Sequence, residues 1–99
     1  MKRLVILGGG ESGVGTALLG KEKGFRVFVS DLGNIKKKYK DVLLHHEIEW
    51  EEGQHKALKI LKADLVVKSP GISDAAPIVK QLRINGVPVV SEIEFAAQF

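Results

Sequence analysis

A glycine-rich turn near the amino terminus constrains the fold of this 99-residue chain more than any other feature. Gly8, Gly10 and Gly13 match the pattern G-x-G-x-x-G, and an aliphatic run over residues 2–7 ends abruptly at this turn. Residues 12–23 follow with apolar side chains at roughly helical spacing. A buried strand, a glycine turn and a helix in this order are typical of the first unit of a parallel α/β fold.

The rest of the chain continues this alternation of strands and helices. We expect further strands at residues 25–30, around Ile48, at 65–67 and at 87–90. We expect further helices at residues 54–62 and 75–85, and a last one that Ser91 caps and that runs to Phe99. Most of residues 32–53 show no clear periodicity, so no helix is assigned there. The predicted fold is a single Rossmann-like, three-layer α/β domain with a roughly five-stranded parallel sheet, whose last strand lies at an edge because it contains Pro88.

The composition limits the classes of function. Hydrophobic residues make up 44% of the chain and charged residues 27%, a balance that argues against a disordered tail. No apolar run approaches the roughly 20 residues of a membrane-spanning helix, and the opening run is too short for a signal peptide, so we expect a cytoplasmic protein without a membrane partner. We interpret the basic run over residues 36–40 as a solvated loop and not as a nucleic-acid patch, because no series of aromatic side chains accompanies it.

The sequence argues against a metal site and against an ATP-binding phosphate loop. The chain has no cysteine, which excludes disulfides and thiolate metal sites. His45 and His46 are adjacent, so in a strand their side chains would point to opposite faces. No acidic residue stands at a metal-ligand spacing from these histidines or from His55, and we therefore expect no metal site. No G-x-x-x-x-G-K-[ST] motif occurs, so no ATP phosphate loop is predicted.

The glycine turn is the first candidate binding site. Glycines let the backbone approach a phosphate, and the amino terminus of the following helix offers free N–H groups and a partial positive charge. The hydroxyl of Ser12 can donate to a phosphate oxygen, cap the helix, or do both. The alternative is a tight strand-to-helix turn without a ligand.

Two other turns can border the same crevice. Asp31 ends the second predicted strand, 18 residues beyond Gly13. An acidic group at this position can accept a hydrogen bond from a ribose hydroxyl or from a base. Alternatively, Asp31 only caps a turn. Ser69, Pro70 and Gly71 follow the strand at residues 65–67. If that strand lies beside the first one, where the strand order reverses, this turn shares the ligand of the glycine loop; otherwise it is an ordinary Pro-Gly turn.

Four blocks of sequence, in the same order, resemble the N-terminal domain of the Mur ligases of peptidoglycan synthesis, and most of all their D-glutamate-adding branch. The blocks are Leu4-Val5-Ile6-Leu7-Gly8-Gly9-Gly10-Glu11-Ser12-Gly13, Phe28-Val29-Ser30-Asp31, Ala63-Asp64-Leu65-Val66-Val67-Lys68-Ser69-Pro70-Gly71-Ile72 and Val89-Val90-Ser91-Glu92-Ile93-Glu94-Phe95. The resemblance covers almost the whole chain. It implies a uridine-nucleotide-binding domain, residues 1–99, that is a fragment of a three-domain ligase.

The resemblance also implies roles for individual residues toward UDP-N-acetylmuramoyl-L-alanine. The diphosphate would contact Gly10, Glu11, Ser12 and Gly13, the uracil would lie at Asp31 and Leu32, and the uridine pocket would be walled by Ser69, Pro70 and Gly71. Leu32 stands where relatives can have a polar residue that contacts the uracil. Glu11 can bind the diphosphate only through its backbone N–H.

In this family ATP and Mg²⁺ convert the substrate carboxylate to an acyl phosphate, which the amine of D-glutamate attacks. Other domains carry those steps, so the resemblance implies a ligase of cell-wall synthesis, shape and division whose 99-residue fragment holds no cofactor and is inactive alone. Two alternatives remain: a free-standing NAD-binding regulatory or dehydrogenase module, and a vestigial fold that serves only for docking. The later sequence blocks argue against the first, and nothing in the sequence favours the second.

Overall fold

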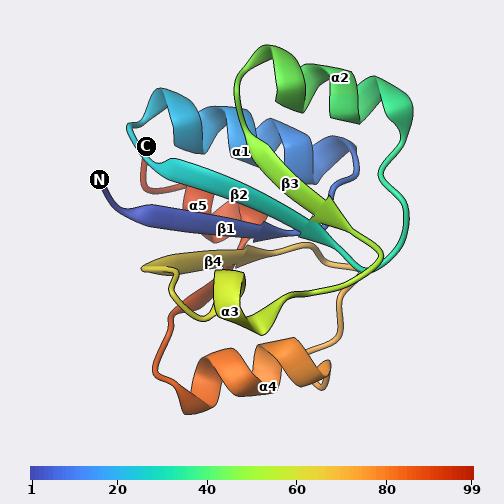
Figure 1. Ribbon diagram of the computed structural model, residues 1–99. Helices are drawn as coiled ribbons and strands as arrows, with labels where there is room; N and C mark the ends of the chain where they lie inside the picture. Colours follow the sequence, from blue (N-terminus) through green and yellow to red (C-terminus); the bar gives the residue numbers. More distant parts are fainter.

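Ten short elements alternate along the chain in the computed structural model, which describes residues 1–99 (Figure 1). The strands are β1 (Arg3–Leu7), β2 (Arg26–Asp31), β3 (Glu49–Glu52), β4 (Leu65–Lys68) and β5 (Val89–Ser91). The helices are α1 (Glu11–Glu22), α2 (Lys37–His45), α3 (Ala57–Ile60), α4 (Pro77–Ile84) and α5 (Glu92–Ala96). None of these helices is both long enough and apolar enough to cross a membrane.

The five strands form one parallel sheet in the order β3-β2-β1-β4-β5. The central strand β1 pairs with β2 on one side and with β4 on the other, so the strand order reverses between β1 and β4. The α/β class and the five-stranded parallel sheet are thereby confirmed. The last strand, β5, lies at an edge, as Pro88 predicted.

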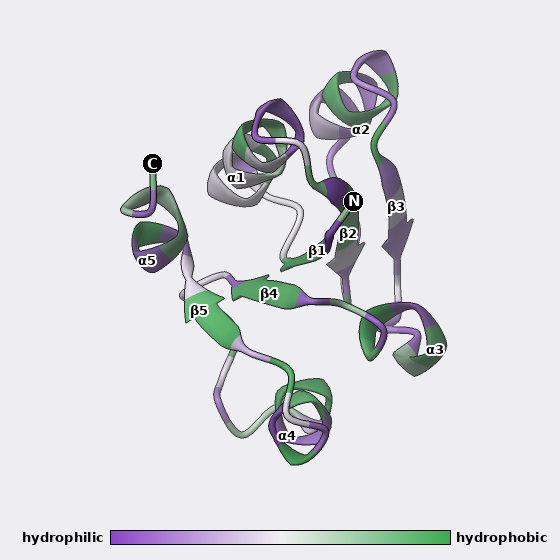
Figure 2. Ribbon diagram, turned by 90° about the vertical axis from the view of Figure 1, so that its left-hand side faces the viewer, coloured by the Kyte–Doolittle hydropathy of each residue, from purple (hydrophilic) through white to green (hydrophobic).

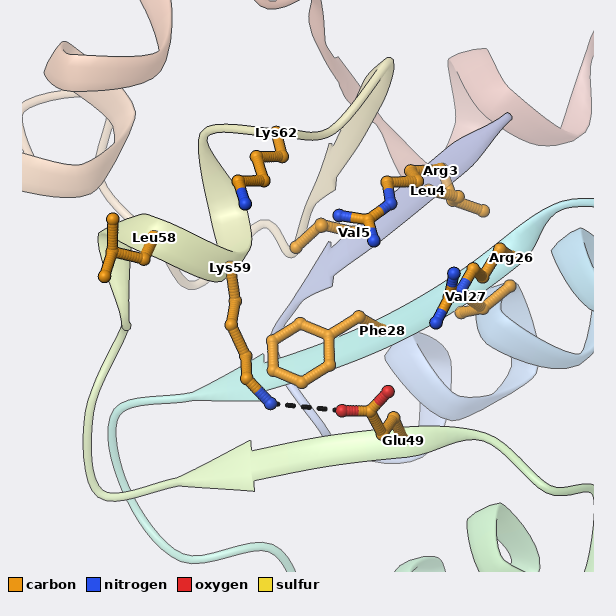
Figure 3. A pocket seen from close by; sticks show the side chains of 10 residues that line it. All are labelled: Arg3, Leu4, Val5, Arg26, Val27, Phe28, Glu49, Leu58, Lys59 and Lys62. Carbon is orange, nitrogen blue, oxygen red and sulfur yellow. Dashed lines mark hydrogen bonds and ion pairs between the residues drawn. The ribbon is translucent and has the colours of Figure 1, made fainter. Parts of the chain in front are cut away.

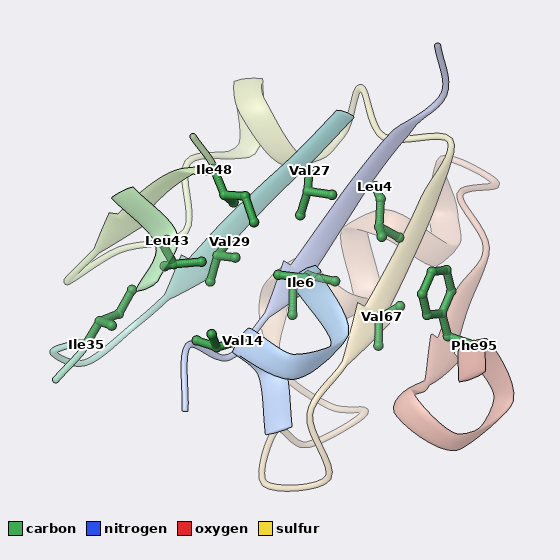
Figure 4. Packing of buried hydrophobic residues seen from close by; sticks show 11 residues of the cluster. Leu4, Ile6, Val14, Val27, Val29, Ile35, Leu43, Ile48, Val67 and Phe95 are labelled. Atoms are coloured by element: carbon green, nitrogen blue, oxygen red, sulfur yellow. The ribbon is translucent and has the colours of Figure 1, made fainter. Parts of the chain in front are cut away.

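Helices cover the two faces of the sheet unequally. Alternate side chains of β1 point to opposite faces, so Leu4 and Ile6 pack under α1, α2 and α5 (Figure 4). Val5 and Leu7 pack on the other face, under α3 and α4. All four of these side chains are buried. Figure 2 shows hydrophobic colour along β4 and β5 and hydrophilic colour along the opposite edge strand, β3.

Helix α2 is the main element that the sequence did not predict. The lysines of residues 36–40 are not a loop: Lys36 is the N-cap, and Lys37 and the residues that follow form the first turn. Only Leu43 of this helix is fully buried. His45 and His46 therefore lie at the carboxyl end of a helix, not in a strand, and their rings contact each other edge to face.

The other differences concern element boundaries. The helix expected at 54–62 is only the single turn α3, and the last helix ends at Ala96 rather than at Phe99. Ser91 does cap α5, and it does so with Glu94: each side chain accepts from the backbone N–H of the other residue, at 3.0 and 2.9 Å. The hydrogen bonds at Glu94 hold the pKa of its carboxyl below the ordinary value.

Candidate phosphate-binding crevice

Three turns meet at the carboxyl ends of β1, β2 and β4. The backbone N–H of Gly8 donates to the carbonyl of Ser30 at 2.8 Å, which joins the glycine turn to the end of β2. The N–H of Ser69 donates to the carbonyl of Leu7 at 3.0 Å, which joins the turn after β4 to the end of β1. β4 lies beside β1, which is the condition under which the sequence predicted that the turn after β4 borders the glycine loop.

Two glycines of the motif are required by the fold itself. Gly8 has φ +113°, and a Cβ atom built on it would lie 2.8 Å from the Cβ of Ser69. A Cβ atom on Gly13 would lie 1.9 Å from the carbonyl oxygen of Gly8, closer than any side chain can approach. These positions let the turn reverse tightly and let α1 pack directly on it.

Gly10 is not required in this way. Its φ of −82° suits any residue, and a Cβ atom there would meet nothing within 4 Å. It is the N-cap of α1 but provides no side-chain hydrogen bond. The space beside it is open, so a ligand can reach the backbone.

The first turn of α1 has backbone donors without partners. The N–H groups of residues 10–13 donate no hydrogen bond within the protein, and the first intrahelical bond runs from the N–H of Val14 to the carbonyl of Gly10, at 2.9 Å. Four free N–H groups at the amino end of a 12-residue helix carry a partial positive charge. The arrangement can bind an anion.

Ser12 does not cap the helix. It is the second residue of α1, because Gly10 occupies the N-cap position. Its side chain is exposed, and its carbonyl accepts from the hydroxyl of Thr16 at 3.0 Å. The hydroxyl of Ser12 makes no hydrogen bond in the structure, so it is free to donate to a ligand.

Asp31 fastens the glycine turn to the turn after β2. Its Oδ2 accepts from the N–H of Gly9 at 2.7 Å, and its Oδ1 accepts from the N–H of Gly33 at 2.8 Å. The second bond caps the turn, as the structural alternative for Asp31 predicted. The first bond holds Gly9, and therefore Gly10, in place beside β2.

A crevice of about 220 Å³ lies next to the glycine turn. Its lining residues come from the turn itself, from the end of β2 and from the segment before α2: Gly9, Gly10, Glu11, Asp31, Asn34, Lys36 and Tyr39. Three of the predicted site residues are among them. Asn34, Lys36 and Tyr39 were not predicted, because they belong to the stretch without clear periodicity.

The segment before α2 is held in place by Glu52. This carboxylate accepts from the N–H of Ile35 at 2.8 Å and pairs with the ammonium of Lys40. The hydrogen bond from Lys40 and then the bond from Ile35 hold the pKa of the Glu52 carboxyl below the ordinary value. These contacts fix the wall of the crevice that Lys36 belongs to.

The remaining predicted residues lie around the crevice without lining it. Leu32 is exposed, and Gly13 is buried beneath the turn. Ser69 lies against Gly8, while Pro70 lines a separate depression of about 430 Å³ beside β5 and α5. Gly71 is exposed in a turn that Lys68 steadies by donating from its ammonium to the carbonyl of Ile72.

His55 belongs to a polar network at the end of β2. Its Nδ1 lies 2.7 Å from the hydroxyl of buried Ser30, which also donates to Glu51 at 2.7 Å. Burial lowers the pKa of His55, and the nearby charges of Glu51 and Asp31 oppose that change. No three histidine, aspartate or glutamate side chains gather in a set that could hold a metal ion.

The fold is that of the Mur ligase N-terminal domains. It resembles a murein peptide ligase from Psychrobacter arcticus with a TM-score of 0.88 at 25% identity, over 99% of this chain and 20% of that one. It resembles UDP-N-acetylmuramate-alanine ligase MurC from Thermotoga maritima with a TM-score of 0.82 at 22% identity, over 99% of this chain and 22% of that one.

Sequence similarity identifies the family within this class. Residues 3–78 match the model of the MurD N-terminal domain, and the chain belongs to that family. It is 60% identical to UDP-N-acetylmuramoylalanine--D-glutamate ligase of Christiangramia forsetii over 99% of the chain, and 59% identical to the protein of the same name in Bacteroides thetaiotaomicron over all of it. The chain spans 22% of the length of each of these relatives.

Proposed function

We propose that this chain binds the uridine diphosphate moiety of UDP-N-acetylmuramoyl-L-alanine, as the N-terminal domain of a ligase that adds D-glutamate in peptidoglycan synthesis. The observation that carries the proposal is the amino terminus of α1, where the backbone N–H groups of residues 10–13 have no partner within the protein and Gly10 leaves the space beside it open. The names of the full-length relatives support the reaction and the substrate.

The diphosphate occupies the amino end of α1 in this proposal. The N–H groups of residues 10–13 donate to its oxygens, and the free hydroxyl of Ser12 adds a further donor. Glu11 contributes only its backbone, because a carboxylate next to a diphosphate is repulsive. The ammonium of Lys36, which lines the same crevice, offsets part of the ligand's charge.

The uridine lies over the neighbouring turns. Asp31 and the backbone of Leu32 flank the uracil, and the turn of Ser69, Pro70 and Gly71, which lies outside the crevice at Gly10 but beside the glycine turn, contacts the uridine from the other side. The hydrogen bonds of Asp31 to Gly9 and Gly33 give it a second role, since they fix the position of the glycine turn before the ligand arrives.

The bond-forming chemistry belongs to other parts of the parent enzyme. ATP with Mg²⁺ supplies the activation of the substrate carboxylate, and we assign the binding of both, and of D-glutamate, to polypeptide outside residues 1–99. The role of this domain is to hold one end of the substrate. We place the parent enzyme in the bacterial cytoplasm.

The substitution Gly10→Asp tests the proposed diphosphate site. Aspartate is a favourable N-cap, so the free energy of unfolding should stay the same or rise by roughly 1 kcal/mol. The same carboxylate occupies the free N–H groups and repels a diphosphate, so the affinity for UDP measured by calorimetry should fall at least about tenfold.

The matched control is Gln81→Glu, which makes the same change of charge on the exposed face of α4. Its affinity for UDP should equal that of the unchanged chain. Equal UDP affinity in the Gly10→Asp variant and the control would contradict the proposal, and the unfolding measurement shows separately that each variant is folded.

A further inference from the structure

Two arginines lie side by side on the sheet, at the end opposite the glycine turn. Arg3 of β1 is in register with Arg26 of β2 at the amino ends of the two strands. Both share the face of Val5 and Phe28, because side chains alternate along a strand. Like charges at paired positions of neighbouring strands repel each other, and an anion between the two guanidinium groups relieves that repulsion.

The protein itself provides no acceptor for these two guanidinium groups. Neither makes a hydrogen bond or an ion pair to any protein group. Of the nearby carboxylates, Glu49 pairs with the ammonium of Lys59 at 3.1 Å, and Asp64 accepts from the backbone N–H of Arg3 at 2.7 Å. The ten donors of the two guanidinium groups therefore remain free for a ligand.

A pocket of about 270 Å³ lies above this arginine pair, between the sheet and α3. Figure 3 shows the side chains of Arg3, Arg26 and Lys62 around the space that Phe28 borders. Four cationic side chains and one carboxylate line the pocket, so its formal charge of +3 equals that of the whole chain. The rest of the chain therefore carries no net formal charge.

The pocket also has apolar surface. Phe28 is half-buried in its floor, and Leu58, at its rim, is 83% exposed. The ammonium of Lys59 lies 5.2 Å from the centre of the Phe28 ring and covers part of it. A ligand that combines a compact anionic group with an apolar group fits these surroundings.

We propose that this pocket is a second binding site, for a small phosphate monoester that carries an apolar or aromatic substituent. The doubly charged phosphoryl group lies between Arg3 and Arg26, where planar guanidinium groups donate in pairs to its oxygens. Lys62 adds a third cation, and the substituent contacts Phe28 and Leu58. The site is separate from the crevice at Gly10, which lies at the other end of the same strands.

The size of the pocket favours a small molecule over a macromolecule. Its volume is close to the lower end of the range typical of small-molecule sites, roughly 300 Å³. The cations gather around one space beneath α3 instead of forming a stripe along the surface (Figure 3). An acidic peptide is therefore a weaker candidate ligand for this pocket, and the experiment below compares the two.

The proposal is tested by titrating the ¹⁵N-labelled chain with phenyl phosphate at constant ionic strength, above the second phosphate pKa of about 6. We expect shifts at the side-chain Nε–H groups of Arg3 and Arg26 and at the backbone of Lys62. Inorganic phosphate should shift the same groups but bind more weakly, because it lacks the ring. The variant Arg26→Gln should bind phenyl phosphate about fivefold more weakly.

The matched control is Lys80→Gln, which removes one exposed positive charge from α4, outside the pocket. It should bind phenyl phosphate as the unchanged chain does. Equal weakening in both variants, or shifts confined to residues 10–13, would overturn the proposal. Tighter binding of a tetraglutamate peptide than of phenyl phosphate at Arg3 and Arg26 would also overturn it.

Discussion

The glycines of the amino-terminal turn differ in what the fold demands of them. At Gly13 a side chain would overlap the carbonyl of Gly8, whereas a Cβ atom on Gly15, two residues further along α1, would meet nothing within 4 Å. The pattern G-x-G-x-x-G therefore combines one position needed for packing α1 against β1 with one, Gly10, that leaves the backbone accessible.

Paired alanine substitutions test this difference at the level of single residues. Gly13→Ala should lower the free energy of unfolding by about 3 kcal/mol or more, because α1 must shift away from the turn. Gly15→Ala should raise it by up to about 1 kcal/mol, since alanine favours a helix and meets nothing there. Urea denaturation measures both, and equal effects would contradict the close contact at Gly13.

At the scale of elements, the network of Ser30, Glu51 and His55 joins β2, β3 and the segment before α3. Burial lowers the pKa of His55 below its ordinary value of 6.5. The unfolded chain therefore takes up this proton at a higher pH than the folded chain does. The contribution of neutral His55 to stability is complete above pH 6.5 and is lost as the pH falls from there toward the folded pKa.

We therefore expect the free energy of unfolding to decrease as the pH falls below 6.5, and to decrease less in the variant His55→Gln. Denaturant titrations at a series of pH values measure this. His45→Gln, at the exposed end of α2, is the control and should keep the full decrease. The same pH dependence in both variants would show that His55 does not contribute to it.

The elements differ in how well sequence predicts them, and the reason is physical. β1 and β4 are continuous aliphatic runs buried on both faces, and such runs are recognisable without a structure. Helix α2 buries only Leu43 completely, and its remaining surface is rich in lysine, so its pattern is weak. Packing of Tyr39 and Val42 beside the core stabilises it, and local sequence does not show that contact.

The same distinction applies to the candidate site. The open amino end of α1 follows from local order along the chain, so Gly10 and Ser12 could be named as candidates, although Ser12 does not line the crevice. The bond between Asp31 and Gly9 depends on β2 lying beside β1, and the approach of Lys36 to the crevice depends on the contacts of Glu52. Those contacts join residues that are far apart in sequence.

At the scale of the whole molecule, we expect this domain to bind substrate without forming the amide bond. The 99-residue chain, supplied with ATP, Mg²⁺, UDP-N-acetylmuramoyl-L-alanine and D-glutamate, should form no amide product. Mass spectrometry of the reaction mixture detects the product directly, and a full-length relative serves as the positive control. Product formation by the 99-residue chain alone would mean that the domain carries catalytic groups that we have not assigned.

Amide chemical-shift mapping on the ¹⁵N-labelled chain, with UDP and with NAD, measures directly which nucleotide the crevice at Gly10 binds. We expect UDP to shift the amides of residues 10–13, 31–33 and 69–71, and NAD at the same concentration to shift them much less. Selective binding of NAD, or shifts by UDP that avoid the amino end of α1, would contradict the proposed function.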